Sequence, residues 1–394
     1  GLLLTNQVSA TEVSTTGTST TSDAITQVTL TEPTLQITKG IIATDSPQGD
    51  LSPGTVGPVA FTAPGSSGVR FSGTINSANL ALTPVDSDLS DVDSGDRVSF
   101  AIVVENIGTG RNGAYDVRIT DTLPQGYRIG AGGLNLQVTN GAGVALAFTG
   151  DLFAGGITLT DPPGAPTGAL APADPASGAN VLVITYDLEI TETPQPRSQI
   201  TNLAEIDNYA AIEGGIDRVP STTVPTLDVA TTRIGDPSFD KVIVSTSLEQ
   251  TGSGQGNAQL DDLAIGEQVT FDLTATLREG RIVGFEIADL LPSSPGELRF
   301  VSAEVVSIGG NIFVRDPLAG NTAGAPLPDP VISQEGSLIR FSFANDIVNL
   351  PDNVVDDNDR IVVRVTAVVT NVPGNVAGTQ LQNVGTLAFQ AAGQ

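Results

Sequence analysis

Short runs in which apolar and polar residues alternate recur along the whole chain. The clearest are residues 97–106, 180–191, 268–277, 338–346 and 360–371, which are rich in Val, Ile, Thr and Phe. Alternation with a period of two places successive side chains on opposite faces of a strand. Clusters of Gly, Pro, Asn and Asp separate the runs, and no segment has the period of a long amphipathic helix. The pattern predicts an all-β chain of tandem immunoglobulin-like antiparallel β-sandwich repeats.

The same succession of runs occurs twice. Residues 94–108 read SGDRVSFAIVVENIG, and residues 265–280 read IGEQVTFDLTATLREG. Further pairs follow in the same order, namely 116–124 with 284–292, 180–191 with 359–371, and 199–208 with 380–389. A fixed order of matching segments indicates that each copy is one structural repeat.

The matches divide the chain into two repeats and a leading segment. We predict a first β-sandwich over residues 33–220, which carries a long loop at 141–180, and a second over residues 221–394. Residues 2–13 resemble the late run that closes each repeat. Residues 1–32 are therefore expected to be the closing strands of a preceding repeat, or a donor segment that pairs with a neighbouring subunit.

Composition removes most catalytic chemistry. The chain has no Cys, His, Met or Trp, so a thiol or imidazole nucleophile, a Ser-His-Asp triad, a Cys/His zinc site and disulfides are all excluded. Carboxylate pairs alone hydrolyse glycosides, but sugar sites usually add stacking aromatic rings. The four tyrosines, Tyr115, Tyr127, Tyr186 and Tyr209, lie in strand-like runs and are expected to be core or strand-edge residues. An enzyme acting on an external substrate is not expected.

Charge restricts the partners. The net charge is -27, from 44 acidic and 17 basic residues, which argues against contacts with nucleic-acid phosphates. No apolar run is long enough to span a bilayer. We expect neither a nucleic-acid partner nor a membrane-spanning segment.

Three motifs, in fixed order, resemble a known family. They are GDRVSF (95–100), ITDTLPQGY (119–127) and ITNLAEI (200–206), with counterparts in the second repeat. This order resembles the bacterial surface repeat called domain of unknown function 11, and it is similar to the isopeptide-forming domains of pilin backbones. The resemblance covers nearly all of the chain. It implies immunoglobulin-like sandwiches in large surface proteins, fibres or adhesins, and a location outside or on the surface of a bacterial or archaeal cell.

Each repeat contains one lysine on its first strand, one aspartate shortly before a proline and one asparagine on a late strand. These are Lys39, Asp121 and Asn202 in the first repeat, and Lys241, Asp289 and Asn383 in the second. Burial would favour a neutral, nucleophilic lysine and a protonated aspartate. A protonated aspartate can polarise the asparagine carboxamide and pass a proton to the leaving ammonia. The resemblance to pilin domains implies this arrangement, and with it a self-catalysed Lys–Asn isopeptide bond.

Simpler roles for the same residues remain open. Aspartate is common at turns, where it caps backbone N–H groups. The asparagines can bond to the backbone, and a lysine on an edge strand blocks aggregation.

Two acid-rich loops are candidates for calcium binding, because Ca²⁺ takes six to eight oxygen ligands from flexible loops. Neither loop has the spacing of an EF-hand, and a solvated acidic turn is the alternative. The candidate ligands are Asp86, Asp88, Asp91, Asp93 and Asp96 in the first loop, and Asp352, Asp356, Asp357 and Asp359 in the second.

These observations together predict a structural protein. The chain is expected to be a subunit of an extracellular filament, sheath or surface layer, with copies of itself as partners and strand exchange as a route of assembly. The alternative is the stalk or binding module of a large surface adhesin, with residues 141–180 as its contact surface. A virion fibre is a third possibility.

Overall fold

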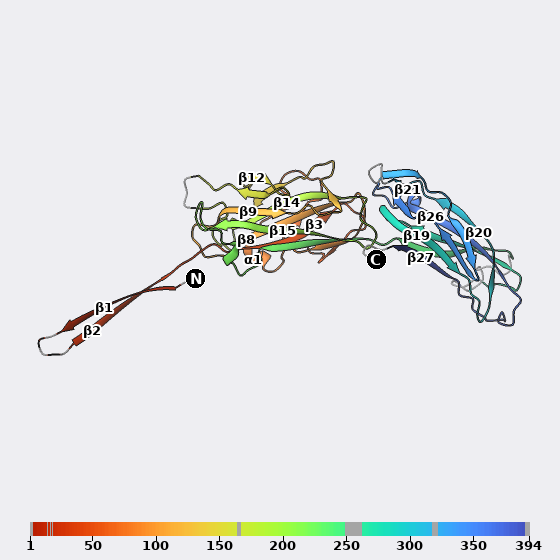
Figure 1. Cartoon of the computed structure of the whole chain (residues 1–394), viewed down its shortest axis with the longest axis horizontal. Coiled ribbons are helices and arrows are strands. Elements are labelled where there is room, and N and C mark those ends of the chain that lie inside the picture. Colours follow the sequence, from red (N-terminus) through yellow and green to blue (C-terminus); the bar gives the residue numbers. More distant parts are fainter. Residues whose placement is uncertain are drawn as a thin grey trace.

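The fold is that of a computed structural model, which describes residues 3–13, 15, 17, 19–163, 167–248, 262–316 and 322–390. Nearly every element is a strand, and the strands form two β-sandwiches that follow one another along the molecule (Figure 1). A separate two-stranded hairpin extends from the first sandwich (Figure 1). The all-β prediction is confirmed.

The first sandwich consists of two sheets packed face to face. One sheet has the order β10 (Tyr127–Arg128), β14 (Val181–Ile190), β8 (Arg97–Asn106) and β3 (Leu35–Thr44), with β11 (Gln137–Asn140) also paired to β14. The other has the order β12 (Phe148–Asp151), β13 (Gly156–Leu159), β9 (Tyr115–Asp121), β15 (Gln199–Ala210), β16 (Leu227–Ile234), β7 (Asp88–Val92) and β4 (Asp50–Ser52). Neighbouring strands are antiparallel except for β16 and β7.

Strands β8 and β14 are buried on both faces. Their inner residues belong to the core between the sheets, and Ala101, Val103, Val181 and Val183 pack in a second apolar cluster on the outer face. The segment between β3 and β7 covers that outer face with the short hairpin of β5 (Ala60–Phe61) and β6 (Phe71–Ser72) and with helix α1 (Ser77–Leu80). Simple alternation, with one face in solvent, is therefore wrong for these two strands.

Within the part of the chain that the structure describes, the second sandwich repeats the arrangement without such a cover. One sheet has the order β17 (Ser238–Thr246), β18 (Gln268–Thr276), β26 (Arg360–Val369) and β20 (Leu298–Ile308). The other has the order β22 (Thr322–Pro326), β21 (Ile312–Asp316), β25 (Asp346–Asn349), β19 (Gly280–Leu290), β24 (Leu338–Ser342) and β23 (Val331–Glu335), and β27 (Val384–Gln390) also pairs with β19. Strict alternation of burial along β18 and β26 fits a sheet with a single buried face.

Two details differ from the sequence-based division. Strand β16 pairs with β15 and β7, so the first sandwich extends to Ile234 rather than ending at residue 220. Residues 225–227 read PTL, as residues 33–35 do at the start of the first repeat. This match explains why β16 was assigned to the second repeat. Residues 141–180 are not one long loop, because β12 and β13 extend the sheet beside β9; residues 164–166 lie outside the described part.

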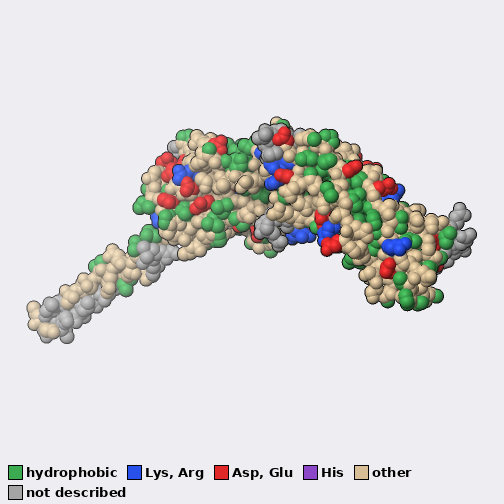
Figure 2. Space-filling view, turned by 45° about the vertical axis from the view of Figure 1, so that its right-hand side comes forward, with side chains coloured by type: hydrophobic (Ala, Val, Ile, Leu, Met, Phe, Trp, Pro, Cys, Tyr) green, Lys and Arg blue, Asp and Glu red, His purple; other side chains and the backbone are tan. Residues whose placement is uncertain are grey.

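The leading segment forms the projecting hairpin of β1 (Leu3–Val13) and β2 (Ser19–Thr29). Within the described residues, neither strand pairs with either sandwich. The register places Leu4, Val8 and Val28 on one face, and all three side chains are about half exposed or more. Figure 2 shows apolar and uncharged side chains along this hairpin.

Candidate functional site: a lysine, an aspartate and an asparagine in each sandwich

The first sandwich buries Lys39 against Asp121. Lys39 lies on β3 and Asp121 ends β9, so they come from opposite sheets and meet in the core. Lys39 Nζ lies 2.7 Å from Asp121 Oδ2, and neither side chain has any solvent exposure. Next to Lys39 in the sequence, Gly40 allows the backbone of residues 86–87 to pass close to β3. A Cβ at Gly40 would lie only 2.7 Å from the Ser87 backbone nitrogen.

Asn202 joins this pair through a tyrosine. Asn202 lies on β15, next to β9 in the same sheet, and is buried. Its Nδ2 donates a hydrogen bond to the hydroxyl of Tyr186 at 2.9 Å, and that hydroxyl donates to Asp121 Oδ2 at 2.5 Å. The ring of Tyr186 stacks on Phe100 and meets the edge of Phe153. The four polar groups thus form one continuous hydrogen-bonded chain.

Burial weakens the charges of the pair. It lowers the pKa of Lys39 to about 8, although Asp121 favours the charged amine. It also raises the pKa of Asp121, although Lys39 and the Tyr186 hydroxyl favour the carboxylate. The ion pair and the neutral pair differ only by the transfer of one proton along a 2.7 Å hydrogen bond. A neutral amine and a carboxylic acid are therefore accessible without exchange of a proton with solvent.

Two oxygen atoms in this cluster have no hydrogen-bond partner among the described residues. They are Asp121 Oδ1 and Asn202 Oδ1, and both are buried. A buried polar atom left unpaired costs about 1–3 kcal/mol. In the neutral pair Asp121 carries a proton and is a hydrogen-bond donor. The carbonyl oxygen of Asn202 is a suitable acceptor for that hydrogen bond.

The second sandwich assembles the same residue types. Lys241 on β17 contacts Asp289 on β19, and Asn383, which precedes β27, donates from Nδ2 to Asp289 Oδ2 at 3.4 Å. Asp289 is fully buried, whereas the Lys241 side chain is 14% exposed. Burial lowers the pKa of Lys241 and raises that of Asp289. Asn383 Oδ1 is buried without a partner, as Asn202 Oδ1 is.

The two sites differ at the tyrosine. In the first sandwich Ile41 pairs with Phe100, which pairs with Tyr186. In the second Ile243 pairs with Phe271, which pairs with Val365. Val365 therefore takes the register position of Tyr186, and the asparagine bonds to the aspartate directly. The role of Tyr186 was missed at the level of sequence, because a tyrosine in an apolar strand is usually only a core residue.

The first acid-rich segment is not a loop throughout, because Asp88 and Asp91 lie on β7, and it is only partly exposed. Asp86, Asp88 and Asp91 are exposed, whereas Asp93 and Asp96 are buried. Asp96 Oδ2 accepts the backbone N–H of Asp93 at 2.9 Å, and Asp88 Oδ1 accepts that of Thr231 at 2.7 Å. These carboxylates act at least in part as caps of turns and strands.

The second acid-rich loop shows the same use of its acids. Asp352 and Asp357 are exposed, Asp356 is half-buried and Asp359 is buried. Asp356 and Asp359 cap each other across a 3₁₀ turn. Within the described part of the chain, no three acids of these loops bring carboxylate oxygens within 4.8 Å of one another. Calcium binding at the loops stays a prediction.

Both loops meet at the junction between the sandwiches, around Glu279. The Glu279 backbone N–H donates to Asp93 Oδ2 at 3.3 Å, and Glu279 Oε1 accepts the N–H groups of Asp352 and Asn353 at 2.8 Å. Burial and the neighbouring acids raise the pKa of Asp93 to about 8, and burial raises that of Glu279 to about 7. This cluster could not be predicted from the sequence, because its members come from different repeats.

One surface trio has metal-like spacing. Among the described residues, only Asp116, Asp161 and Glu213 bring carboxylate oxygens within 4.8 Å of one another. Asp116 and Asp161 are half-buried and Glu213 is exposed. Asp161 Oδ2 accepts the Asp116 backbone N–H at 3.1 Å, so the trio also organises the local turns.

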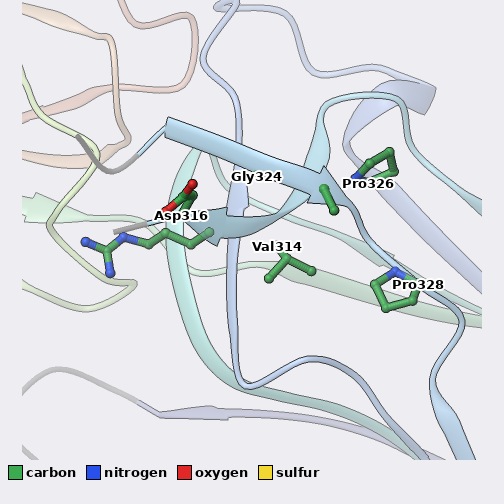
Figure 3. Close-up of a pocket in the computed structure, with 7 residues that line it drawn as sticks. Val314, Asp316, Gly324, Pro326 and Pro328 are labelled. Carbon is green, nitrogen blue, oxygen red and sulfur yellow. The ribbon is translucent and has the colours of Figure 1, made fainter. Parts of the chain in front are cut away.

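A shallow pocket lies at the edge of the second sandwich (Figure 3). Its volume is about 420 Å³, and Figure 3 shows proline and aliphatic side chains along it. Its one cationic lining group, Arg315, is paired with Asp346 at 3.0 Å. The pocket therefore offers few free polar groups to a ligand.

No helix in the described residues is long and apolar enough to cross a membrane. No family model matches the chain, and no curated protein matches it. The resemblance to the surface repeat family therefore stays a prediction.

Solved structures similar to the chain include an antigen-family domain and two pilin subunits of bacteria. The C-terminal domain of the Streptococcus pyogenes antigen I/II-family protein AspA is 11% identical, with a TM-score of 0.30 over 77% of this chain and 92% of that one. The major pilin subunit of Bacillus cereus is 12% identical, with a TM-score of 0.29 over 87% and 64%. The T6 backbone pilin of Streptococcus pyogenes is 9% identical, with a TM-score of 0.26 over 93% and 53%.

Proposed function

We propose that the chain is a structural subunit of an extracellular filament, sheath or surface layer, and that a Lys–Asn isopeptide bond fastens each of its sandwiches. The observation that carries this proposal is the position of the two lysines in the fold. Lys39 is fully buried and Lys241 is mostly buried; each contacts an aspartate, and each aspartate is linked by hydrogen bonds to an asparagine. Burial of a lysine is costly, and its occurrence at matching places in both sandwiches calls for a common chemical reason.

The bond forms by attack of the amine on the carboxamide. Proton transfer within the Lys39–Asp121 pair leaves a neutral Nζ, which attacks Cγ of Asn202. Protonated Asp121 stabilises the carbonyl oxygen, where negative charge develops. The tetrahedral intermediate loses one proton from Nζ and gains one on Nδ2, so that ammonia leaves and Asp121 retains the proton that it received from Lys39. Lys241, Asp289 and Asn383 supply the same groups in the second sandwich.

The bond would resist force. It joins β3 of one sheet to β15 of the other, which lie near the two ends of the first sandwich in sequence. A cross-link that closes so long a loop restricts the unfolded chain, and by loop entropy alone stabilises the fold by roughly 5 kcal/mol. Without cysteine, the chain has no disulfide that could do the same work.

Assembly is proposed to use the projecting hairpin and a second copy of the chain. In the first sandwich β15 lies between β9 and β16. In the second, β27 pairs with β19 along one edge, and no other strand of the described residues pairs with it. The hairpin presents Leu4, Val8 and Val28 on one face. Addition of the hairpin to the open edge of β27 would bury that face and satisfy backbone groups of both partners.

The mass of the denatured chain tests the bonds. Each bond releases one ammonia, so two bonds lower the mass by about 34 Da below that of the sequence. Lys39→Ala and Lys241→Ala should each restore about 17 Da, because each removes one nucleophile. An undiminished mass of the natural chain contradicts the proposal. Imaging of the purified chain then separates ordered filaments from the single rods expected of an adhesin stalk.

A further inference from the structure

Tyr186 occupies a special position between the reacting groups of the first sandwich. Its hydroxyl accepts from Asn202 Nδ2, the nitrogen that leaves as ammonia, and donates to Asp121 Oδ2, the acid. In the second sandwich Asn383 donates a hydrogen bond directly to Asp289. In the first sandwich two hydrogen bonds through the phenol of Tyr186 connect Asn202 with Asp121. The corresponding position of the second sandwich is Val365, which has no polar side-chain atom.

We propose that Tyr186 is a catalytic group of the first sandwich, which relays a proton from Asp121 to the leaving nitrogen of Asn202, whereas Asp289 serves Asn383 directly. This inference rests on the proposed isopeptide bond and adds a residue to its mechanism. It also assigns two different proton paths to two sites that share the same lysine, aspartate and asparagine.

The relay balances in protons. The tetrahedral intermediate has a new bond between Lys39 Nζ and Asn202 Cγ. The Tyr186 hydroxyl passes its proton to Nδ2 and takes the proton of Asp121 in the same step. The Cγ–Nδ2 bond breaks and ammonia leaves, while Nζ returns its surplus proton to the Asp121 carboxylate. Tyr186 and Asp121 end as they began, and no other reactant is needed.

The environment of Tyr186 suits this role. The hydroxyl is fully buried, and burial next to Asp121 raises its pKa well above the ordinary value, so it keeps its proton until an acceptor forms. The ring is fixed by Phe100 and Phe153 at centroid distances of 5.4 and 5.6 Å. Both hydrogen bonds of the hydroxyl reverse when Asp121 is protonated and Nδ2 becomes an amine nitrogen, and a rigid hydroxyl that both donates and accepts can then pass a proton while the ring stays in place.

The test compares the two bonds within the same molecules. Chains of Tyr186→Phe are made by cell-free synthesis and quenched in acid and denaturant at successive times, and each bond is followed by the mass of its peptides. We expect the Lys39–Asn202 bond to form roughly 100-fold or more slowly, as for the loss of a general acid. The Lys241–Asn383 bond, which has no tyrosine, should form at the natural rate and serves as the internal clock.

Tyr127→Phe is the matched control. Tyr127 is a buried tyrosine that packs on the same Phe100, and its hydroxyl bonds Thr232 Oγ1 at 2.6 Å. The variant loses a buried hydroxyl that makes no direct hydrogen bond to Lys39, Asp121 or Asn202. Both isopeptide bonds should therefore form at natural rates. An equally slow first bond in Tyr127→Phe would attribute the effect to general loosening of the core and overturn the relay.

A second variant keeps the hydroxyl in place. Incorporation of 3,5-difluorotyrosine at position 186 makes the phenol more acidic at nearly the same size. A relay predicts a changed rate of the first bond and a shifted pH profile, whereas a hydroxyl that only holds its neighbours predicts neither, and that result would overturn the proposal. Full-speed formation in Tyr186→Phe overturns the relay alone. Absence of the first bond in the natural chain overturns the isopeptide bond itself and the relay with it.

Discussion

Lys39 Nζ and Asp121 Oδ2 lie 2.7 Å apart in the core of the first sandwich, where neither side chain reaches solvent. A buried ion pair contributes little net stability, because the desolvation of both charges offsets their attraction. Its presence in both sandwiches is therefore better explained by chemistry than by stability. The same contact that holds the two charges lets one proton pass and creates the amine and the acid that bond formation needs.

Removal of the acid should abolish one bond only. In Asp121→Ala the amine loses its proton acceptor and the carboxamide its proton donor, so the Lys39–Asn202 bond is expected to be absent. The denatured mass should rise by about 17 Da beyond the change from Asp to Ala. The Lys241–Asn383 bond should persist in the same chains. Formation of both bonds in Asp121→Ala would show that the aspartate is a spectator.

The rate of the first bond should depend on pH with a maximum. The reactive pair holds one proton. Protonation of the carboxylate in the ion pair blocks the reaction at low pH, and because burial raises the pKa of Asp121, this limb lies above the ordinary range of aspartate. Loss of the shared proton removes the acid above the pKa of Lys39, about 8. Rates of bond formation at pH 5 to 10 check this shape, and a rate that rises steadily to pH 10 would contradict it.

The junction acids should make the fold less stable as the pH rises. Asp93 and Glu279 have folded pKa values of about 8 and about 7, above their ordinary values of 3.8 and 4.5. The folded state therefore binds their protons more tightly, and stability falls as pH rises from about 4 to about 8. Asp93→Asn should raise the melting temperature at pH 8 by roughly 2–4 °C and change it little at pH 5.

Asp91→Asn is the control for this substitution. Asp91 lies on β7, close to Asp93 in the sequence, and both carboxylates are near Arg278, at 3.7 and 3.9 Å, but the Asp91 side chain is about half exposed. The substitution Asp91→Asn should leave the melting temperature nearly unchanged at both pH 5 and pH 8. Equal effects of the two substitutions would attribute them to Arg278 rather than to repulsion among buried acids.

The hairpin should be needed for assembly and not for folding. Val8→Glu places a charge on the apolar face of the hairpin, where the side chain is 62% exposed. We expect the melting temperature and both bonds to be unchanged, and filaments to be lost in negative-stain images. Val331→Glu, at a 72% exposed position on the edge strand β23, is the control and should leave filaments intact. Normal filaments in Val8→Glu would contradict strand addition by the hairpin.

Much of the fold follows from local patterns. Alternation along residues 268–277 and 360–371 predicts β18 and β26, because each has one buried face. The sets of lysine, aspartate and asparagine could be predicted from their matching positions, since two lysines in a chain of 394 residues stand out.

Long-range packing could not be predicted in the same way. The cover over β8 and β14 comes from residues 45–85, whose irregular pattern gives no sign of what they pack against. Glu279 gains Asp93 as an acidic neighbour only when the two sandwiches meet. Tyr186 has the surroundings of any core tyrosine in the sequence, and its hydrogen bonds depend on the position of the facing sheet.

The most direct measurement is the sequencing of cross-linked peptides. The natural chain is digested, and branched peptides are fragmented in a mass spectrometer. The account predicts two of them, one that joins Lys39 to Asn202 and one that joins Lys241 to Asn383, each lighter than its two component peptides by about 17 Da. Recovery of all four residues in linear peptides of unmodified mass would contradict the account, and the buried lysines would then be ion pairs and nothing more.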